Sequence, residues 1–313
     1  MITLGIDTSN YTTSCAVFDS VKNTVIQRKK LLPVKEGEKG LRQSDAVFHH
    51  TQQLSGLLTD LFKEANVKID AVGVSDKPRD VVGSYMPCFS VGYNTASAVA
   101  AALGVPLYCF SHQKGHILAA LFSAGKIELI SNPFIAFHIS GGTTECLNVT
   151  PDKEKIIKEE IIGETKDLNI GQAIDRCGVM LGMPFPCGKH IEELAAGSGK
   201  TFKPKVSVKK TDCSMSGLEN LCMKMYEKNE APEDIAKFCL EFAAKTVFKM
   251  TEAAIDRCGK LPVVYAGGVM SNLFIRDYLS SSFDAVFSQP EYSCDNAAGT
   301  AVLAYLKGQI NAC

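Results

Sequence analysis

The feature that most constrains the fold is a strand–turn–strand unit that occurs twice. Residues 2–18 form an apolar run, a hydroxyl-rich turn and a second apolar run that contains a cysteine, and residues 134–149 repeat this order. Two copies of one supersecondary unit predict an internal duplication and therefore two similar lobes. Apolar strands alternate with amphipathic helices along the chain, which is typical of a layered α/β fold.

The length of 313 residues agrees with two lobes. We expect an N-terminal lobe over residues 1–130 and a C-terminal lobe over residues 131–313. The final helix, at about residues 293–307, is a candidate for packing back on the N-terminal lobe.

The composition favours a cytoplasmic protein without a membrane partner. The net charge of −1 provides no overall field that would attract nucleic acid, so any RNA contact needs a local patch. The 12 cysteines contain no CxxC pair, which indicates a reducing compartment, and four lie in apolar runs and are predicted to be buried: Cys15, Cys109, Cys146 and Cys239. We see no signal peptide and no apolar run near the ~20 residues that span a membrane.

His112 and His116 are four residues apart and follow an apolar strand-like run. On a helix that begins after Ser111, a predicted N-cap, the two imidazoles would share one face and could hold a divalent metal. Two unrelated surface histidines are the alternative. A metal also needs a third ligand, and Asp295, near the start of the last helix, is either that ligand or only a cap of the helix.

Three other segments suit phosphate groups. The turn Ser140–Thr144 contains two glycines between hydroxyls, although Gly-Gly is also common in ordinary hairpins. Gly267-Gly268 separates a predicted strand from a helix, as in nucleotide-binding turns, but it is not the GxGxxG of dinucleotide sites. The basic segment 200–210 is either a solvated loop or a contact for a phosphodiester backbone.

Taken together and in this order, these segments resemble the tRNA threonylcarbamoyladenosine synthase family, formerly called O-sialoglycoprotein endopeptidase or glycoprotease. The similarity extends over nearly the whole chain, from Gly5-Ile6-Asp7-Thr8-Ser9 to Asp295-Asn296-Ala297-Ala298. The other shared motifs are His112-x-x-x-His116, Ser140-Gly141-Gly142-Thr143-Thr144, Gly163-Glu164-Thr165 and Gly267-Gly268-Val269-x-x-Asn272. The resemblance implies the duplicated, RNase H-like two-lobed fold of the actin and sugar kinase superfamily.

The resemblance also implies a set of site residues. The implied metal ligands, for iron or zinc, are His112, His116 and Asp295. The implied residues for the phosphate and acyl-adenylate are His138, Ile139, Ser140, Gly141 and Gly142. The implied residues for the adenosine part are Asp175, Gly188, Glu192 and Asn272, although an acid in the middle of a helix, such as Asp175, is usually solvated. Ser9 and Asn10 are candidates near the reactive end.

The implied reaction is transfer of the threonylcarbamoyl group from threonylcarbamoyl-AMP to N6 of adenosine 37 in tRNA. The divalent metal would polarise the carbamoyl carbonyl, and the enzyme would otherwise act by positioning the amine. The implied partners are tRNA and small accessory proteins of the tRNA-modification complex, or a paralogue, which would bind around residues 45–105. A homodimer is a further option.

The chain departs from the family at its first turn, where Tyr11 and Thr12 replace an acidic pair. This loss favours a second hypothesis: a catalytically altered paralogue that binds adenine nucleotide and metal as a partner or regulatory protein, or that uses another acceptor. Retention of all three metal-ligand residues favours the enzyme. A sugar or acetate-type kinase would need a catalytic acid near the phosphates, and a peptidase has no HExxH to support it.

Overall fold

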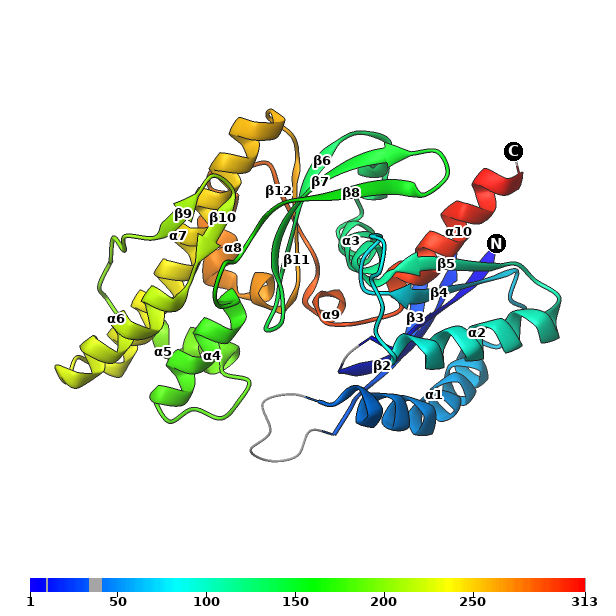
Figure 1. Cartoon of the computed structure of the whole chain (residues 1–313), viewed down its shortest axis with the longest axis horizontal. Helices are drawn as coiled ribbons and strands as arrows, with labels where there is room; N and C mark the ends of the chain where they lie inside the picture. Colours follow the sequence, from blue (N-terminus) through cyan, green and yellow to red (C-terminus); the bar gives the residue numbers. More distant parts are fainter. Residues whose placement is uncertain (10, 34–40, 313) are drawn as a thin grey trace. The chain divides into compact units, whose positions relative to one another are not determined.

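The computed structural model describes residues 1–9, 11–33 and 41–312, and it divides into two compact units (Figure 1). The first unit comprises Met1–Ile130, Pro151–Lys158 and Cys294–Cys313, and the second comprises Ser131–Thr150 and Glu159–Ser293. The last helix therefore belongs to the first unit. The assignment of Pro151–Lys158 to the first unit differs from the expected continuous lobe 131–313.

The first unit contains a five-stranded sheet with the order β3-β2-β1-β4-β5. Strands β1, β2 and β3 form an antiparallel meander, and β4 and β5 continue the sheet in parallel with β1. The strands are β1 (Ile2–Asp7), β2 (Thr12–Asp19), β3 (Thr24–Leu31), β4 (Ala71–Lys77) and β5 (Leu107–Ser111).

The second unit repeats this topology. Its five-stranded sheet has the order β12-β11-β6-β7-β8, in which β6 and β7 are antiparallel and β11 and β12 continue in parallel with β6. The strands are β6 (Phe134–Ile139), β7 (Thr144–Asp152), β8 (Ile156–Glu164), β11 (Val263–Ala266) and β12 (Ala285–Phe287). Since both sheets have the same strand order, the predicted duplication and α/β fold class are confirmed.

The helices of the first unit cover both faces of its sheet. Leu4 and Ile6 of β1 pack into the core with side chains of α1 and α2, whereas Thr3 and Gly5 face α10. The helices are α1 (Gln43–Ala65), α2 (Phe89–Leu103), α3 (His112–Ser123) and α10 (Ala298–Ala312). A Cβ on Gly5 would overlap the backbone of α10 at Ala301, so the glycine allows this helix to contact the strand closely.

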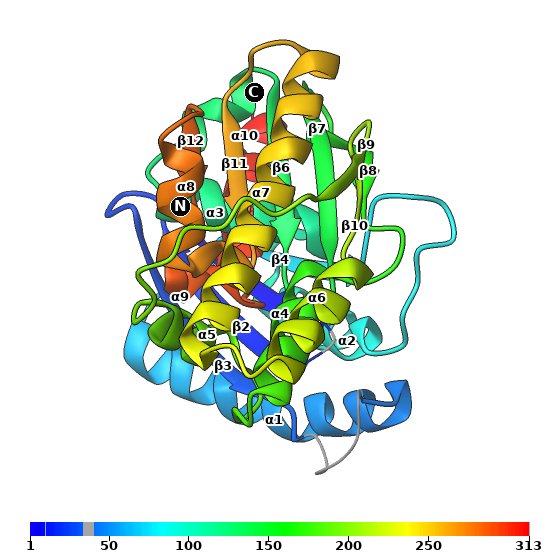
Figure 2. The same ribbon diagram turned by 90° about the vertical axis from the view of Figure 1, so that its left-hand side faces the viewer.

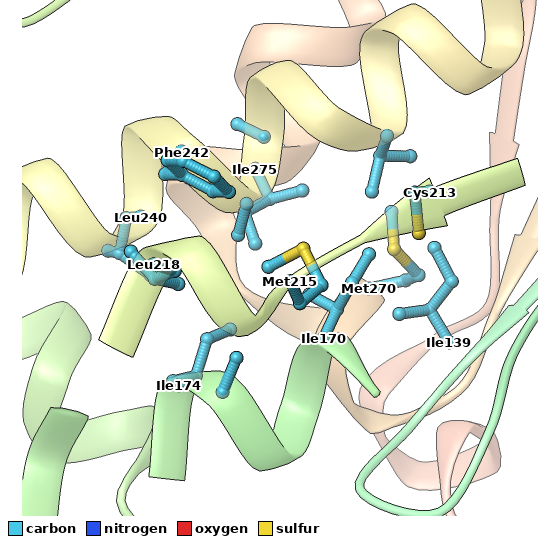
Figure 3. Close-up of a cluster of buried hydrophobic side chains, with 14 of the residues drawn as sticks. Ile139, Ile170, Ile174, Cys213, Met215, Leu218, Leu240, Phe242, Met270 and Ile275 are labelled. Atoms are coloured by element: carbon cyan, nitrogen blue, oxygen red, sulfur yellow. The ribbon is translucent and has the colours of Figure 1, made fainter. Parts of the chain in front are cut away.

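The second unit has a core built around the long helix α7, which runs alongside its sheet (Figure 2). Its helices are α4 (Ile170–Met180), α5 (Gly188–Ala195), α6 (Ser216–Glu227), α7 (Pro232–Cys258), α8 (Leu273–Ser280), α9 (Pro290–Ser293) and the 3-10 turn η2 (Gly268–Ser271). Figure 3 shows side chains from α4, α6, α7 and α8 meeting Met215 and Met270 in this core. A short ribbon, β9 (Ser207–Lys209) with β10 (Asp212–Ser214), adds to it.

Three local features differ from expectation. The last helix begins at Ala298, because residues 290–293 form the separate turn α9. Cys109 is exposed because β5 is the edge strand of its sheet. The other three cysteines that were predicted to be buried are buried. The basic segment 200–210 includes β9. None of the helices in the described part of the chain is long and apolar enough to cross a membrane.

Candidate functional site

The junction between β5 and α3 positions the two histidines. Ser111 ends the strand in an extended conformation, and its side chain accepts a hydrogen bond from the backbone N–H of Lys114, 3.2 Å away, so the predicted N-cap is confirmed. His112 and His116 consequently lie on successive turns of α3, and their Nε2 atoms are 2.9 Å apart. The two imidazoles form one cluster and are not unrelated surface groups.

Asp295 completes this cluster from the segment that precedes α10. Its Oδ1 lies 3.6 Å from Nε2 of His112 and 3.3 Å from Nε2 of His116. Asn296, and not Asp295, caps the helix, because Asn296 Oδ1 accepts a hydrogen bond from the N–H of Ala298, 3.0 Å away. The alternative role of Asp295 as a mere cap is therefore not observed.

The spacing of the three atoms suits a metal ion. His112, His116 and Asp295 form the one group of at least three His, Cys, Asp or Glu ligand atoms within 4.8 Å of one another among the described residues. Donors about 2.1 Å from one tetrahedral ion lie roughly 3.4 Å apart, which matches the observed separations. Two imidazoles and one carboxylate suit iron or zinc, and they leave coordination positions for a substrate.

Asp7 supports this cluster, although the sequence analysis did not single out its side chain. Nδ1 of His112 donates a hydrogen bond to Asp7 Oδ2, 2.8 Å away, and the N–H of Ser9 donates to Asp7 Oδ1 at 2.9 Å. This contact holds the His112 ring with Nε2 toward His116 and Asp295. β1, β4 and β5 are parallel, so residues at their carboxyl ends meet at one edge of the sheet, and this strand order is what reveals the role of Asp7.

The charges of the cluster are coupled. Burial would lower the pKa of His112, but the carboxylates of Asp7 and Asp295 outweigh burial and raise the pKa to about 10. Burial would raise the pKa of each carboxyl group, yet His112 holds the pKa of both Asp7 and Asp295 below its usual range. Burial and the neighbouring charge of His112 lower the pKa of His116. Without a metal, one imidazolium thus lies between two carboxylates.

The first turn of the chain lies beside this cluster. Ser9 is buried, and its Oγ has no hydrogen-bond partner among the described residues. Asn10, the other candidate at the reactive end, lies outside the described residues. Tyr11 is 36% exposed, whereas Thr12 is buried in β2. His50 of α1 is also buried, with Nδ1 2.8 Å from Thr13 Oγ1, and burial lowers its pKa to about 4.

In the second unit, two glycines border the turn after β6. His138 and Ile139 end the strand, and the N–H of Ser140 donates to the carbonyl of Thr143 at 2.8 Å. A Cβ on Gly171 of α4 would lie 2.6 Å from the carbonyl oxygen of Ser140, and a Cβ on Gly267, where φ is +99°, would overlap the carbonyl of Ile139. The two turn glycines, Gly141 and Gly142, have open space beside them.

The four residues implied for adenosine are linked through α5. Oδ1 of Asp175 accepts a hydrogen bond from the N–H of Cys187, 2.8 Å away, directly before Gly188 begins α5. Glu192, one turn after Gly188, accepts from the N–H of Leu273 at 2.7 Å. Asn272 precedes Leu273 and caps α8. Asp175 is partly buried, and burial raises the pKa of its carboxyl group.

The fold defines a class of protein. The duplicated five-stranded sheets belong to the fold of the actin and sugar kinase superfamily. A ROK family glucokinase from Streptomyces griseus, solved with glucose and AMPPNP, superposes with a TM-score of 0.54 at 10% sequence identity, over 98% of this chain and 100% of the glucokinase chain. At this low identity, the similarity establishes the fold alone.

Residues 22–302 match the model of the tRNA N6-adenosine threonylcarbamoyltransferase family, and the chain belongs to this family. A probable bifunctional tRNA threonylcarbamoyladenosine biosynthesis protein from Thermoplasma acidophilum is 28% identical over 98% of this chain, which spans 57% of that relative. A tRNA N6-adenosine threonylcarbamoyltransferase from Ligilactobacillus salivarius is 33% identical over 82% of this chain and 77% of its own length. The resemblance seen in the sequence is confirmed, although the chain spans only about half the length of the bifunctional relatives.

Proposed function

We propose that this protein transfers the threonylcarbamoyl group of threonylcarbamoyl-AMP to N6 of adenosine 37 in tRNA, in the cytoplasm. The family supports a transferase in threonylcarbamoyladenosine biosynthesis. The observation that carries the proposal for this chain is the convergence of His112, His116 and Asp295, with Asp7 behind His112. The paralogue hypothesis would not require this set to be intact.

His112 Nε2, His116 Nε2 and an oxygen of Asp295 would hold one iron or zinc ion. When bound, the ion would supply a Lewis acid for the carbamoyl carbonyl oxygen. The protein's own contribution is orientation: Asp7 accepts the Nδ1 proton of His112 and so keeps Nε2 directed at the other two ligands. Ser9, whose N–H also bonds Asp7, places a hydroxyl beside the same carboxylate.

The second unit would hold the adenylate. Gly141 and Gly142, with open space beside their backbone, would admit the phosphate against the turn after β6. Asp175 and Glu192 each use one oxygen to bind a backbone N–H, and this contact orients the other oxygen for a ribose hydroxyl. The transfer would proceed chiefly because the acceptor amine is positioned against the acyl group.

Small accessory proteins are part of the proposal. We place their contact on the helical part of the first unit, around residues 45–105, as the family resemblance implies. Phe48 of α1 is 57% exposed and Tyr93 of α2 is 42% exposed, and exposed aromatic groups of this kind are common in protein interfaces. A paralogue or a second copy of the chain are the other candidate occupants of this surface.

The test is complementation followed by nucleoside analysis of tRNA. Cells depleted of their own threonylcarbamoyladenosine synthase would express the protein, the variant His112→Ala, or the control His190→Ala, which changes an exposed histidine on α5. We expect the modified nucleoside to return with the unchanged protein and with the control, but not with His112→Ala. If the unchanged protein binds adenine nucleotide and the modification never returns, the paralogue hypothesis replaces this proposal.

A further inference from the structure

The first unit contains a second polar site, on another side of α3 from the histidines. A cavity of about 400 Å³ lies along β5, and Lys77, Asp80, Lys114, Lys155 and Lys307 are among its lining residues. All of them belong to the first unit. At about 100° per residue, position 114 lies about 200° around the helix from positions 112 and 116. The cavity therefore shares the first turns of α3 with the metal cluster but faces away from it.

Three lysines of this cavity pair with the carboxylate of Asp80. Nζ of Lys114 and Nζ of Lys155 both lie 3.0 Å from Asp80 Oδ2, and Nζ of Lys77 lies 3.4 Å from Oδ1. Burial would raise the pKa of Asp80, but hydrogen bonds and charges from Lys155 and Lys114 outweigh it and hold the pKa far below its usual range. Three ammonium groups thus converge on a single carboxylate.

Positive charge exceeds negative charge among the residues that line the cavity. Four lysines line it, against the carboxyl groups of Asp80 and Glu154. Two further carboxylates lie outside the lining, Asp152 near Lys114 and Lys155 and Asp76 near Lys77. The fourth lysine, Lys307, donates to the backbone carbonyl of Glu154 at 2.6 Å. The side chain of Lys114 is only 4% exposed, and a buried ammonium is costly unless anionic partners surround it.

We propose that this cavity binds a phosphate group, and that the group is a backbone phosphate of the RNA substrate. The assignment to RNA rests on the proposed function. A phosphate offers several anionic oxygens at once, so it can accept from the lysines that Asp80 also binds, and lysine binds phosphate as a compact point charge. The turn expected to hold the adenylate phosphate belongs to the second unit, so this would be a separate phosphate site.

The exposure of the lysine side chains increases from the interior to the surface. Lys114 is buried, the side chain of Lys77 is 34% exposed, and that of Lys155, on the hairpin between β7 and β8, is 54% exposed. A macromolecule can reach the outer two, while the buried lysine adds charge behind them. This gradient favours an extended polyanion over an ion enclosed within the protein.

The double variant Lys77→Gln/Lys155→Gln tests the proposal, because both side chains are partly exposed and their loss should not prevent folding. Its control is Lys22→Gln/Lys63→Gln, which removes the same charge from exposed positions of the same unit. Fluorescence anisotropy with labelled tRNA would measure Kd over a range of salt concentrations. Relative to the control, we expect the double variant to bind tRNA about tenfold more weakly. We also expect the slope of log K against log salt concentration to correspond to about one fewer released counterion.

Inorganic phosphate distinguishes the two sources of the group. If phosphate competes with tRNA for the unchanged protein and not for the double variant, the RNA assignment is supported. If tRNA affinity equals that of the control while calorimetry shows phosphate binding that depends on Lys77 and Lys155, the RNA assignment is overturned in favour of a free phosphate. If the affinities for tRNA and for phosphate are both unchanged by the loss of the two lysines, the whole inference is wrong. Nucleoside analysis of the same variants tests the transfer reaction separately.

Discussion

Asp7 and His112 are 105 residues apart in the chain, yet their side chains are joined by a 2.8 Å hydrogen bond. Asp7 is the last residue of β1 and His112 directly follows β5, two strands of the same parallel set, so the topology of the sheet brings them together. The bond leaves only one nitrogen of His112 for the cluster with His116 and Asp295. The strand order thus determines which imidazole nitrogen is presented to a metal.

We predict that Asp7→Asn weakens metal binding without removing a ligand. The amide can still bond the imidazole, but it lacks the charge that orients the ring and increases its basicity, so affinity should fall by about 10- to 100-fold. Competition with a chelator of known affinity measures the change. Asp19→Asn, at the end of β2 that pairs with Ile2 and so lies away from Asp7, is the control, and an equal loss in both variants would contradict the role of Asp7.

We predict a pH-dependent stability that depends on His50. Its folded pKa of about 4 lies below the ordinary value of 6.5, so the unfolded chain binds the proton more readily. Stability contributed by the neutral ring is therefore complete above pH 6.5 and is lost as the pH falls toward 4, by roughly 2 kcal/mol between pH 7 and pH 5. Urea unfolding at both pH values should show a smaller loss in His50→Gln than in the matched variant His49→Gln.

We predict that Glu192→Gln weakens adenine nucleotide binding by about 5- to 30-fold, the effect of losing one charge-assisted hydrogen bond. The change keeps the shape of the side chain and its acceptor for the N–H of Leu273. Isothermal titration with a non-hydrolysable adenine nucleotide gives the affinity. Glu193→Gln alters the exposed neighbour on the same helix, and it should bind as the unchanged protein does.

We predict opposite effects for two glycine-to-alanine changes in helices. A Cβ on Gly299 would overlap the carbonyl oxygen of Gly115 where α10 contacts α3, so Gly299→Ala should destabilise by about 2 kcal/mol or more and weaken metal binding through Asp295. Gly56 in α1 has open space around it, and Gly56→Ala should stabilise by about 0.5 to 1 kcal/mol. Denaturant midpoints of both variants check the signs.

Local pattern accounted for most of the elements that the sequence analysis predicted. The continuous apolar runs located β1 and β6, and the four-residue spacing of His112 and His116 was sufficient to place both on one helix face. Asp295 remained ambiguous, because a carboxylate near a helix start is also a common cap, and only the position of Asn296 in the fold resolves it.

Features that depend on several distant segments could not be predicted. Asp80 looks like an ordinary loop acid until three lysines from separate elements surround it. The assignment of Pro151–Lys158 to the first unit likewise depends on contacts that have no local signature. The pairing of His112 with His116 could be predicted because the two residues are one helical turn apart. The contact of Asp7 with His112 could be predicted only from the strand order.

The discontinuity of the first unit has a consequence for the order of events during synthesis. Asp295 and α10 belong to this unit, but they are translated after the whole second unit. At about 5 to 20 residues per second, a ribosome needs on the order of 10 to 30 seconds to proceed from Ile130 to Cys294. During that interval the nascent chain exposes Gly5, Gly73 and Gly115 where α10 will pack. The third candidate metal ligand is therefore added last, and the nascent chain cannot bring His112, His116 and Asp295 together until the whole second unit has been synthesised.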